Sequence, residues 1–511
     1  MVKSRSKKLL LNTIFSVLLE IVTLISGLIL PRLILETFGS DTNGLVNSIT
    51  QFLAFVSFLE LGVGAVVQSA LYKPIANNNY EEISKIYSSA QRFFRKIAFF
   101  LVVYIVVLLF IYPVIVNSNF SFGYIDILII VMSITSFSQY YFGIVNTLLL
   151  NSDQNNYIQY IISIVSMILN IIVCYIMIKL NFPIQVVKLV SSIVLIIKPL
   201  FLKLYVKKNY NINKKIKYDD EPIKQKWNGM AQHFAHIVLV NTDTIVLSVF
   251  STLTNVSIYT IYNYIIIGVK NLLTSLTNGF LSLMGNLYAR DEKKKLFDVF
   301  GYIEWFLHSI TILLFGCTSI LIVNFVKVYT LGITDADYIQ PLFGVLITVA
   351  NAIHCLRLPY NNLIKAAGHY KQTQNNFIIA MFINIIISII TVRVWGLIGV
   401  SIGTLIAMLY QTLWMSWYIS KNIICWPLKN FYKQILVDSL IVIISGFLTY
   451  NIPMAAINYQ SWLFLAIKVF SIWFFIEIVL NFIFYKEKMF VLLHKIKKNG
   501  KKNDKCNCSN I

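Results

Sequence analysis

Five ionisable residues stand far from the ends of the long apolar stretches that fill this chain. They are three acids and two bases: Glu20, Glu60, Asp243, Lys270 and Arg357. A charged side chain at the centre of a bilayer costs about 2.5–3.5 kcal/mol or more, unless it faces a water-filled cavity or a partner. These residues therefore predict either a binding site for a charged ligand or buried ion pairs.

Uncharged polar residues accompany these charges at helical spacing. They form four sets. Within a set, neighbouring members are three or four residues apart, or in two cases seven, and this spacing puts them on one face of a helix. The sets are Thr13, Ser16, Glu20, Thr23 and Gly27; His233, His236 and Asp243; Asn263, Lys270, Thr274 and Thr277, with Asn271 and Asn278 alongside; and Asn351, His354, Arg357 and Asn361, in a helix that Pro359 is expected to kink.

Two interpretations of these sets remain open. The sets either line a wet central cavity, or they hold helices together through buried pairs such as Glu20 with Lys270. Helix packing alone does not require polar faces on four helices, so their number favours the cavity. The predicted substrate-binding residues are then Lys270, Arg357, Asn263, Asn271, Thr274 and Asn361, and the predicted ion-coupling residues are Glu20, Glu60 and Asp243.

The apolar stretches that carry these residues are long enough to cross a bilayer, which takes about 20 residues. Hydrophobic residues make up 57% of the chain and charged ones 13%, so little is left for a domain in water. We predict an all-α integral membrane protein with 14 spans near 9–35, 44–71, 94–116, 123–150, 157–179, 182–206, 229–250, 256–289, 302–326, 338–364, 374–394, 395–419, 433–452 and 461–484.

The net charge of +21 has a strongly uneven distribution. With the first residue inside, 34 Lys and Arg residues fall in inner segments and four in outer segments. This asymmetry follows the positive-inside rule and predicts that both termini are cytoplasmic. The charge therefore indicates membrane topology and anionic lipid headgroups as neighbours, rather than nucleic acid.

An internal repeat divides the chain. Residues 154–158 (QNNYI) match 374–378 (QNNFI), and Leu71-Tyr72 matches Leu287-Tyr288 at equivalent points of two blocks. Six spans in each block predict parallel repeats around a central cavity, and a carrier that rocks about it. Duplication without moving parts is the alternative. The predicted parts are 1–206 and 229–419 (six-helix bundles), 207–228 (basic linker), 420–484 (two extra helices) and 485–511 (basic tail).

Other chemistry finds little support in the sequence. It contains no phosphate-binding glycine loop and no nucleophile constellation, and its six cysteines are scattered. We expect no catalytic residue, no metal and no cofactor. Three further lysines, Lys188, Lys198 and Lys468, lie within reach of span ends and are predicted to snorkel to the membrane surface.

Three segments are similar to a known family. ILPRLILETFGSDTNGL (29–45), FLELGVGAVVQSALYKP (58–74) and NNLIKAAGHYK (361–371) resemble the bacterial oligosaccharide-lipid flippases. These are the Wzx-type transporters of the multidrug/oligosaccharidyl-lipid/polysaccharide exporter superfamily. The resemblance implies an alternating-access carrier in the bacterial cytoplasmic membrane. It would turn a polyprenyl-pyrophosphate-linked oligosaccharide to the outer leaflet for surface polysaccharide synthesis.

The resemblance also implies roles and partners. Lys270 and Arg357 would hold the pyrophosphate, the asparagines would bind sugar hydroxyls, and glycan-assembly membrane proteins are a further partner class. Lipid II flippases carry arginines in the first helix of the cavity, where this chain has Glu20. That departure favours a surface-polysaccharide unit over lipid II as cargo, although a lipid II flippase remains an alternative.

Other classes of function stay open at this stage. A cation-coupled multidrug antiporter shares the fold and would suit the acids of the predicted cavity. A membrane enzyme would need a large outer loop or a catalytic motif, and a scaffold would not need charges inside the membrane. We therefore expect a transporter and not an enzyme.

Overall fold

The computed structural model describes residues 5–60, 63–116, 118–213, 216 and 230–491. Most of the predicted linker 207–228 and of the predicted tail 485–511 lies outside these residues, as do the side chains of His233 and His236. All regular structure in the described part is helical, which confirms the all-α fold class.

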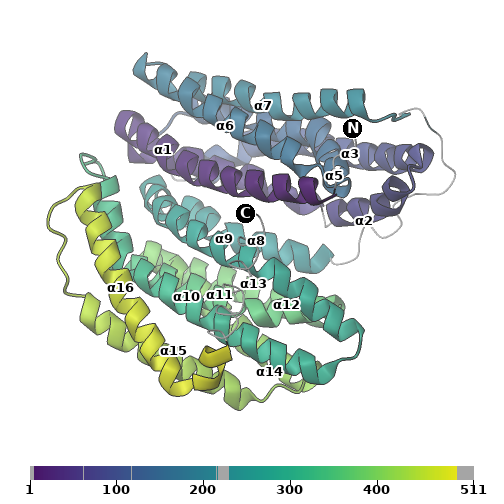
Figure 1. The fold of residues 1–511 in the computed structure, drawn as a ribbon. Helices are drawn as coiled ribbons and strands as arrows, with labels where there is room; N and C mark the ends of the chain where they lie inside the picture. Colours follow the sequence, from purple (N-terminus) through teal and green to yellow (C-terminus); the bar gives the residue numbers. More distant parts are fainter. Residues whose placement is uncertain (1–4, 61–62, 117, 214–215, 217–229, 492–511) are drawn as a thin grey trace, which may run out of the picture. The chain divides into compact units, whose positions relative to one another are not determined.

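The first half of the chain forms helices α1 to α7, with two short irregular helical turns, η1 and η2, between them. Helix α1 packs against α6, which in turn packs against α7, and these three lie side by side in Figure 1. The elements are α1 (Arg5–Ala54), η1 (Phe55–Glu60), α2 (Val63–Ala76), α3 (Tyr80–Ile115), α4 (Phe122–Ser138), η2 (Gln139–Gly143), α5 (Ile144–Ser152), α6 (Asn156–Lys179) and α7 (Ile184–Asn209).

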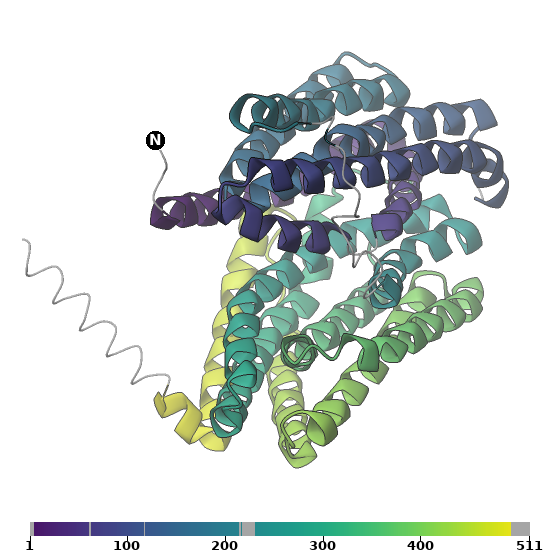
Figure 2. The same cartoon turned by 90° about the vertical axis from the view of Figure 1, so that its right-hand side faces the viewer.

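The second half repeats this order and adds two helices. Both added helices pack on α10, and Figure 2 shows α16 beside it. The elements are α8 (Met230–Phe250), α9 (Leu253–Ala289), α10 (Lys293–Tyr329), α11 (Pro341–Leu356), α12 (Leu358–Ala366), α13 (Tyr370–Trp395), α14 (Leu397–Asn422), α15 (Leu428–Thr449) and α16 (Tyr459–Phe484).

All 14 predicted spans fall on these helices. Twelve segments among the described residues are long and apolar enough to cross a membrane. The difference of two arises because the first segment, Leu10–Ser57, runs from the first predicted span into the second, and because α8 is not among the twelve. Large apolar side chains face outward on the helices, including Phe110 (75% exposed) and Phe475 (68% exposed). This is the surface expected of a multi-pass membrane protein.

The segment ILPRLILETFGSDTNGL contains the turn that separates the first two spans. Gly39 interrupts α1 with a φ of +82°, a conformation that glycine adopts without steric cost. The next residue, Ser40, donates from its backbone N–H (2.6 Å) and its hydroxyl (2.7 Å) to the Asp335 carboxylate. At Gly44, an added Cβ would lie 1.8 Å from the carbonyl oxygen of Leu253. The backbone conformation at position 39 and the close contact at position 44 therefore both favour glycine.

Contacts within the chain define two compact units. The first unit comprises residues 1–264, 332–337 and 373–403, and the second comprises 265–331, 338–372 and 404–511. Each has its own apolar core, around residues such as Leu45 and Phe94 in the first unit and Trp473 and Val469 in the second. The predicted boundaries of the two six-helix bundles stay a prediction.

The fourth span of each half is broken. In the first half, the π-helical turn η2 separates α4 from α5, and in the second half Arg357 separates α11 from α12. Pro359 occupies the first turn of α12, which confirms the predicted interruption there. Gly143 and Arg357 precede the positive-φ residues Gln154 and Gly368 by the same number of residues. Broken helices at matching places in two repeats mark the binding sites of many membrane carriers.

Candidate functional site

The break in the first half opens onto a polar cavity within the first unit. Its volume is about 560 Å³, within the range of about 300–1,000 Å³ that is usual for small-molecule sites. We call it the N-terminal cavity. Its walls come from α1, η1, α4, η2, α5, α6 and α7, and they are formed by Leu53, Ala54, Glu60, Thr135, Ser136, Gln139, Tyr140, Ile144, Ser163, Ser166, Met167, Leu195 and Lys198.

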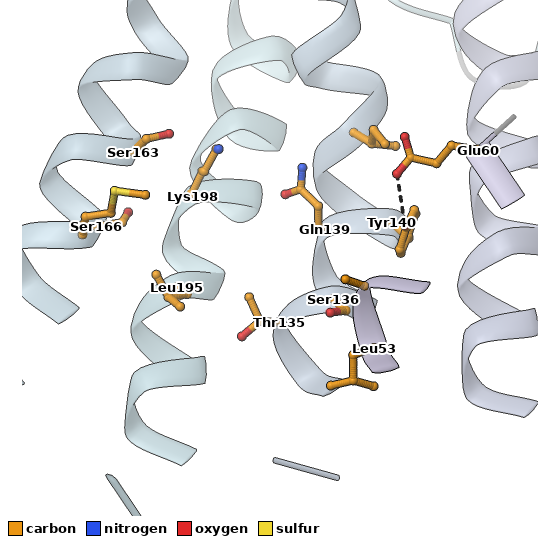
Figure 3. Close-up of a pocket in the computed structure, with 13 residues that line it drawn as sticks. Leu53, Glu60, Thr135, Ser136, Gln139, Tyr140, Ser163, Ser166, Leu195 and Lys198 are labelled. Atoms are coloured by element: carbon orange, nitrogen blue, oxygen red, sulfur yellow. Dashed lines mark hydrogen bonds between the residues drawn. The ribbon is translucent and has the colours of Figure 1, made fainter. Parts of the chain in front are cut away.

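The π turn positions the polar residues at the centre of this wall. Close packing fixes the turn, because a Cβ at Gly143 would lie 2.6 Å from Oε1 of Gln139 and 3.0 Å from Cβ of Pro199. Figure 3 shows Gln139 and Lys198 between the serines of α6 and Glu60. The hydroxyl of Tyr140 donates a hydrogen bond of 2.9 Å to Oε1 of Glu60.

A second cavity of about 290 Å³ adjoins the first and shares Leu53, Thr135, Ser136 and Leu195 with it. Its polar wall contains hydroxyl, amide and thiol groups and one further lysine. These residues are Thr50, Asn170, Cys174, Lys188, Ser191 and Ser192.

Several polar groups on these walls have no protein partner. Among the described residues, neither Lys188 nor Lys198 forms an ion pair or hydrogen bond. The hydroxyl of Ser166, 2% exposed, also has no hydrogen-bond partner. Buried polar groups normally find partners in the protein, in water or in a ligand. Two unpaired ammonium groups, set among hydroxyls and amides, form a site suited to an anion that also carries hydroxyl groups.

This arrangement differs from the prediction for the two lysines. The sequence predicted that Lys188 and Lys198 snorkel to the membrane surface, whereas the structure places both on cavity walls. The polar residues that surround the two lysines in the sequence could have indicated a cavity. Ser163, Ser166 and Asn170 follow helical spacing on α6. On α7, Ser191 lies about one turn and Lys198 about three turns after Lys188.

The three predicted ion-coupling acids occupy different surroundings. Glu60 lies on the wall of the N-terminal cavity, and Glu20 is exposed on α1. Asp243 is 4% exposed, and it accepts hydrogen bonds from the Tyr259 hydroxyl at 3.0 Å and from the Asn384 amide at 3.4 Å. The polar site around Asp243 thus draws on α8, α9 and α13.

The predicted cations lie in the second unit. Arg357 is 2% exposed at the α11–α12 break, and its Nη2 lies 2.9 Å from Nδ1 of His354. Its Nε and Nη1 have no hydrogen-bond partner. Lys270 is half-buried on α9. Both predicted cations therefore belong to the second unit.

The remaining predicted residues differ in burial. Asn361, one turn after Arg357, is 9% exposed, and its Oδ1 has no hydrogen-bond partner. On α9, Asn263 and Thr274 are half-buried and Asn271 is exposed. The hydroxyl of Thr274 donates to the carbonyl oxygen of Asn271 at 3.1 Å.

Comparison with known proteins places the fold. No protein-family model and no curated protein matches this sequence. A structure of the lipid II flippase MurJ in an inward closed conformation matches with a TM-score of 0.70 and 17% identity, over 94% of this chain and 100% of that chain. An inward-facing multidrug resistance MATE family transporter of the MOP superfamily matches with a TM-score of 0.64 and 13% identity, over 79% and 94%.

A Vibrio cholerae MATE transporter also matches, with a TM-score of 0.56 and 12% identity, over 82% of this chain and 99% of that chain. At these identities the likeness concerns the fold. The chain has the helical membrane fold shared by a lipid II flippase and MATE transporters, as the sequence resemblance to their superfamily predicted.

Proposed function

We propose that this protein is a flippase for a polyprenyl-pyrophosphate-linked oligosaccharide, which it moves to the outer leaflet by alternating access. The observation that carries this proposal is the N-terminal cavity, where Lys198 and the adjoining Lys188 face hydroxyl and amide groups without a partner of their own. Ammonium groups bind phosphate oxygens, and serine, threonine and glutamine side chains bind sugar hydroxyls. The polar head of a lipid-linked sugar carries both kinds of group.

The second unit supplies a further anion-binding group in this proposal. Arg357 lies at the break of the fourth span, and two of its three guanidinium nitrogens have no hydrogen-bond partner. Lys270 and Arg357 would hold the pyrophosphate in one part of the cycle, and Asn263, Asn271, Thr274 and Asn361 would bind sugar hydroxyls. The apolar tail would stay in the bilayer.

The membrane potential suits this direction of transport. An interior-negative potential favours outward movement of an anion by about 2.3 kcal/mol per charge per 100 mV. Exchange of a cation at Asp243, Glu60 or Glu20 would add to this force. In the proposal the protein lies in the bacterial cytoplasmic membrane with both termini inside, next to glycan-assembly membrane proteins.

Lipid II flipping is the second candidate, favoured by the similarity to a lipid II flippase structure. However, α1 carries the exposed Glu20 in place of an arginine, and this difference favours a cargo with a different sugar from that of lipid II. A multidrug antiporter for organic cations is the third candidate, and the unpaired lysines of the N-terminal cavity oppose a cationic ligand.

Reconstituted protein separates these candidates. Proteoliposomes that contain a fluorescent polyprenyl-pyrophosphate oligosaccharide, lipid II, or a cationic dye would be assayed for transfer of each compound between leaflets or across the membrane. The proposal requires fastest transfer of the lipid-linked oligosaccharide. Transfer of the dye alone would overturn it, and preference for lipid II would establish the second candidate.

A further inference from the structure

A second group of buried charges lies inside the second unit, at the interface of α10, α12, α15 and α16. His308 is 0% exposed and Asp438 is 3% exposed, and His308 Nδ1 lies 2.7 Å from Asp438 Oδ2. The Gln434 amide donates to Asp438 Oδ1 at 3.0 Å. Both oxygens of the Asp438 carboxylate therefore have a polar partner.

Glu304 is the second carboxylate of this group and is 2% exposed. Its Oε1 accepts a hydrogen bond of 2.6 Å from the Tyr360 hydroxyl and one of 3.1 Å from the Trp426 indole N–H. Both donors bind the same oxygen, so Glu304 links α10 to α12 and to the segment that precedes α15.

Glu477 is the third carboxylate, and its surroundings differ. It is 6% exposed, and its Oε1 accepts a hydrogen bond of 2.8 Å from the Asn481 amide. Its Oε2 has no hydrogen-bond partner, although it is buried. An ionised carboxylate with a buried, unpaired oxygen is costly, whereas the protonated acid is neutral. The surroundings of Glu477 therefore favour a bound proton.

Electrostatics within the interface act in the same direction. The facing titratable and charged groups are Glu304 and His308 on α10, Tyr360 on α12, Lys433 and Asp438 on α15, Glu477 and Tyr485 on or after α16, and Lys488 beyond it. The negative charge of Asp438 acts on Glu477, and like charges in a low-dielectric interior oppose a second ionisation. His308 Nε2 is also buried, and it has no hydrogen-bond partner.

We propose that Glu477 and the His308–Asp438 pair form a proton-binding site, with hydronium from the aqueous phase as the donor and Glu477 Oε2 as the atom that takes the proton. The site includes none of the acids considered for ion coupling above, and it links protonation to the packing of α16 against α10. Asn481 makes this link, because it binds Glu477 and accepts hydrogen bonds from the α10 residues Trp305 and Ser309. No substrate is required for the proton to bind.

Infrared difference spectroscopy tests the proposal on the purified full-length protein. Wild-type protein at neutral pH should show the carbonyl stretch of a protonated carboxylic acid, and Glu477→Gln should lose an amount of it that corresponds to one carboxyl per chain. Glu487→Gln, which changes an exposed acid of the same region, is the matched control and should lose none. An unchanged band in Glu477→Gln would overturn the proposal.

Two further variants keep the test decisive if Glu477→Gln does not fold. Glu477→Asp retains an acid and should shift the frequency of that band without removing it. His308→Gln should displace the pH at which the band is lost, and an unmoved midpoint would contradict the role of the His308–Asp438 pair. These readouts involve no transport, so they remain informative whatever cargo the protein carries.

Discussion

The hydroxyl of Tyr140, in the π turn of the fourth span, donates a 2.9 Å hydrogen bond to Glu60 in the 3-10 turn of the second span. Both residues lie on the wall of the N-terminal cavity. The bond thus joins two irregular backbone segments at the point where the polar groups of the cavity gather. Irregular backbone at membrane depth is tolerated where it lines such a cavity.

We predict that Tyr140→Phe destabilises the protein by about 1–3 kcal/mol, because Glu60 then loses its donor in a partly buried place. Thermal unfolding in detergent, followed by the loss of helical circular dichroism, would measure this. The double variant Glu60→Gln/Tyr140→Phe should lose less than the sum of the two single changes. Additive losses would show that the two side chains do not interact.

The packing of the last helix on α10 depends on Gly316. A Cβ at this position would lie 1.9 Å from Cζ3 of Trp473, a residue that is 1% exposed on α16. Gly316→Ala should therefore destabilise the protein by about 1–3 kcal/mol through overpacking. Gly446→Ala on α15, where nothing lies within 4 Å, is the matched control and should be neutral or slightly stabilising.

The compensating variant makes this prediction sharper. Trp473→Leu frees space beside position 316, so Gly316→Ala should cost less in that background than in the wild type. Thermal melts of the four proteins give the coupling free energy. An equal cost in both backgrounds would place the strain elsewhere.

Lys488, beyond the last span, has a perturbed titration. Burial lowers the pKa of its ammonium to about 8; Glu304 opposes this shift and Lys433 adds to it. Since the unfolded chain keeps this proton up to a pKa of about 10.4, the unfolded state binds more protons between pH 8 and 10. The contribution of Lys488 to stability should therefore rise with pH across that window.

The difference between wild type and Lys488→Met isolates this effect from other titrations. The melting temperature of the wild type should rise relative to that of the variant between pH 7.5 and 9.5. Lys486→Met, which removes an exposed lysine two residues earlier, should show no such trend against the wild type. If the difference in melting temperature between wild type and Lys488→Met did not change with pH, the lowered pKa of Lys488 would be contradicted.

The helices could be predicted well because the bilayer imposes a simple rule on apolar length. Every predicted span falls on a helix, and Pro359 correctly indicated the interruption of the tenth span. The π turn at 139–143 could not be predicted, because it contains no proline, and only the close packing of Gly143 reveals it. The kink at Gly39 depends in the same way on a distant residue, Asp335.

The candidate site was less predictable. Arg357 and Glu60 could be predicted because they are charges at mid-span, whereas Lys188 and Lys198 lie near enough to a span end that snorkelling was expected. Glu304 and Glu477 were not predicted, because they lie towards the ends of the predicted spans 302–326 and 461–484, yet both are buried. Burial depends on which helices pack together, and sequence spacing on a single helix does not contain that information.

The cavity lysines offer the most direct test of the central claim, that the head group of a lipid-linked oligosaccharide binds in the first unit. Flipping of a fluorescent polyprenyl-pyrophosphate oligosaccharide would be measured in proteoliposomes for wild type, Lys188→Ala/Lys198→Ala, the corresponding double arginine variant, and Lys468→Ala. Lys468 is exposed on α16 and provides a matched control. Circular dichroism melts would confirm that each variant is folded.

We expect Lys188→Ala/Lys198→Ala to slow flipping about tenfold or more, since a hydrogen bond to a charged group contributes about 1.5–3 kcal/mol. The arginine variant should retain part of the activity, and Lys468→Ala should match the wild type. Wild-type flipping by the folded Lys188→Ala/Lys198→Ala protein would contradict the account.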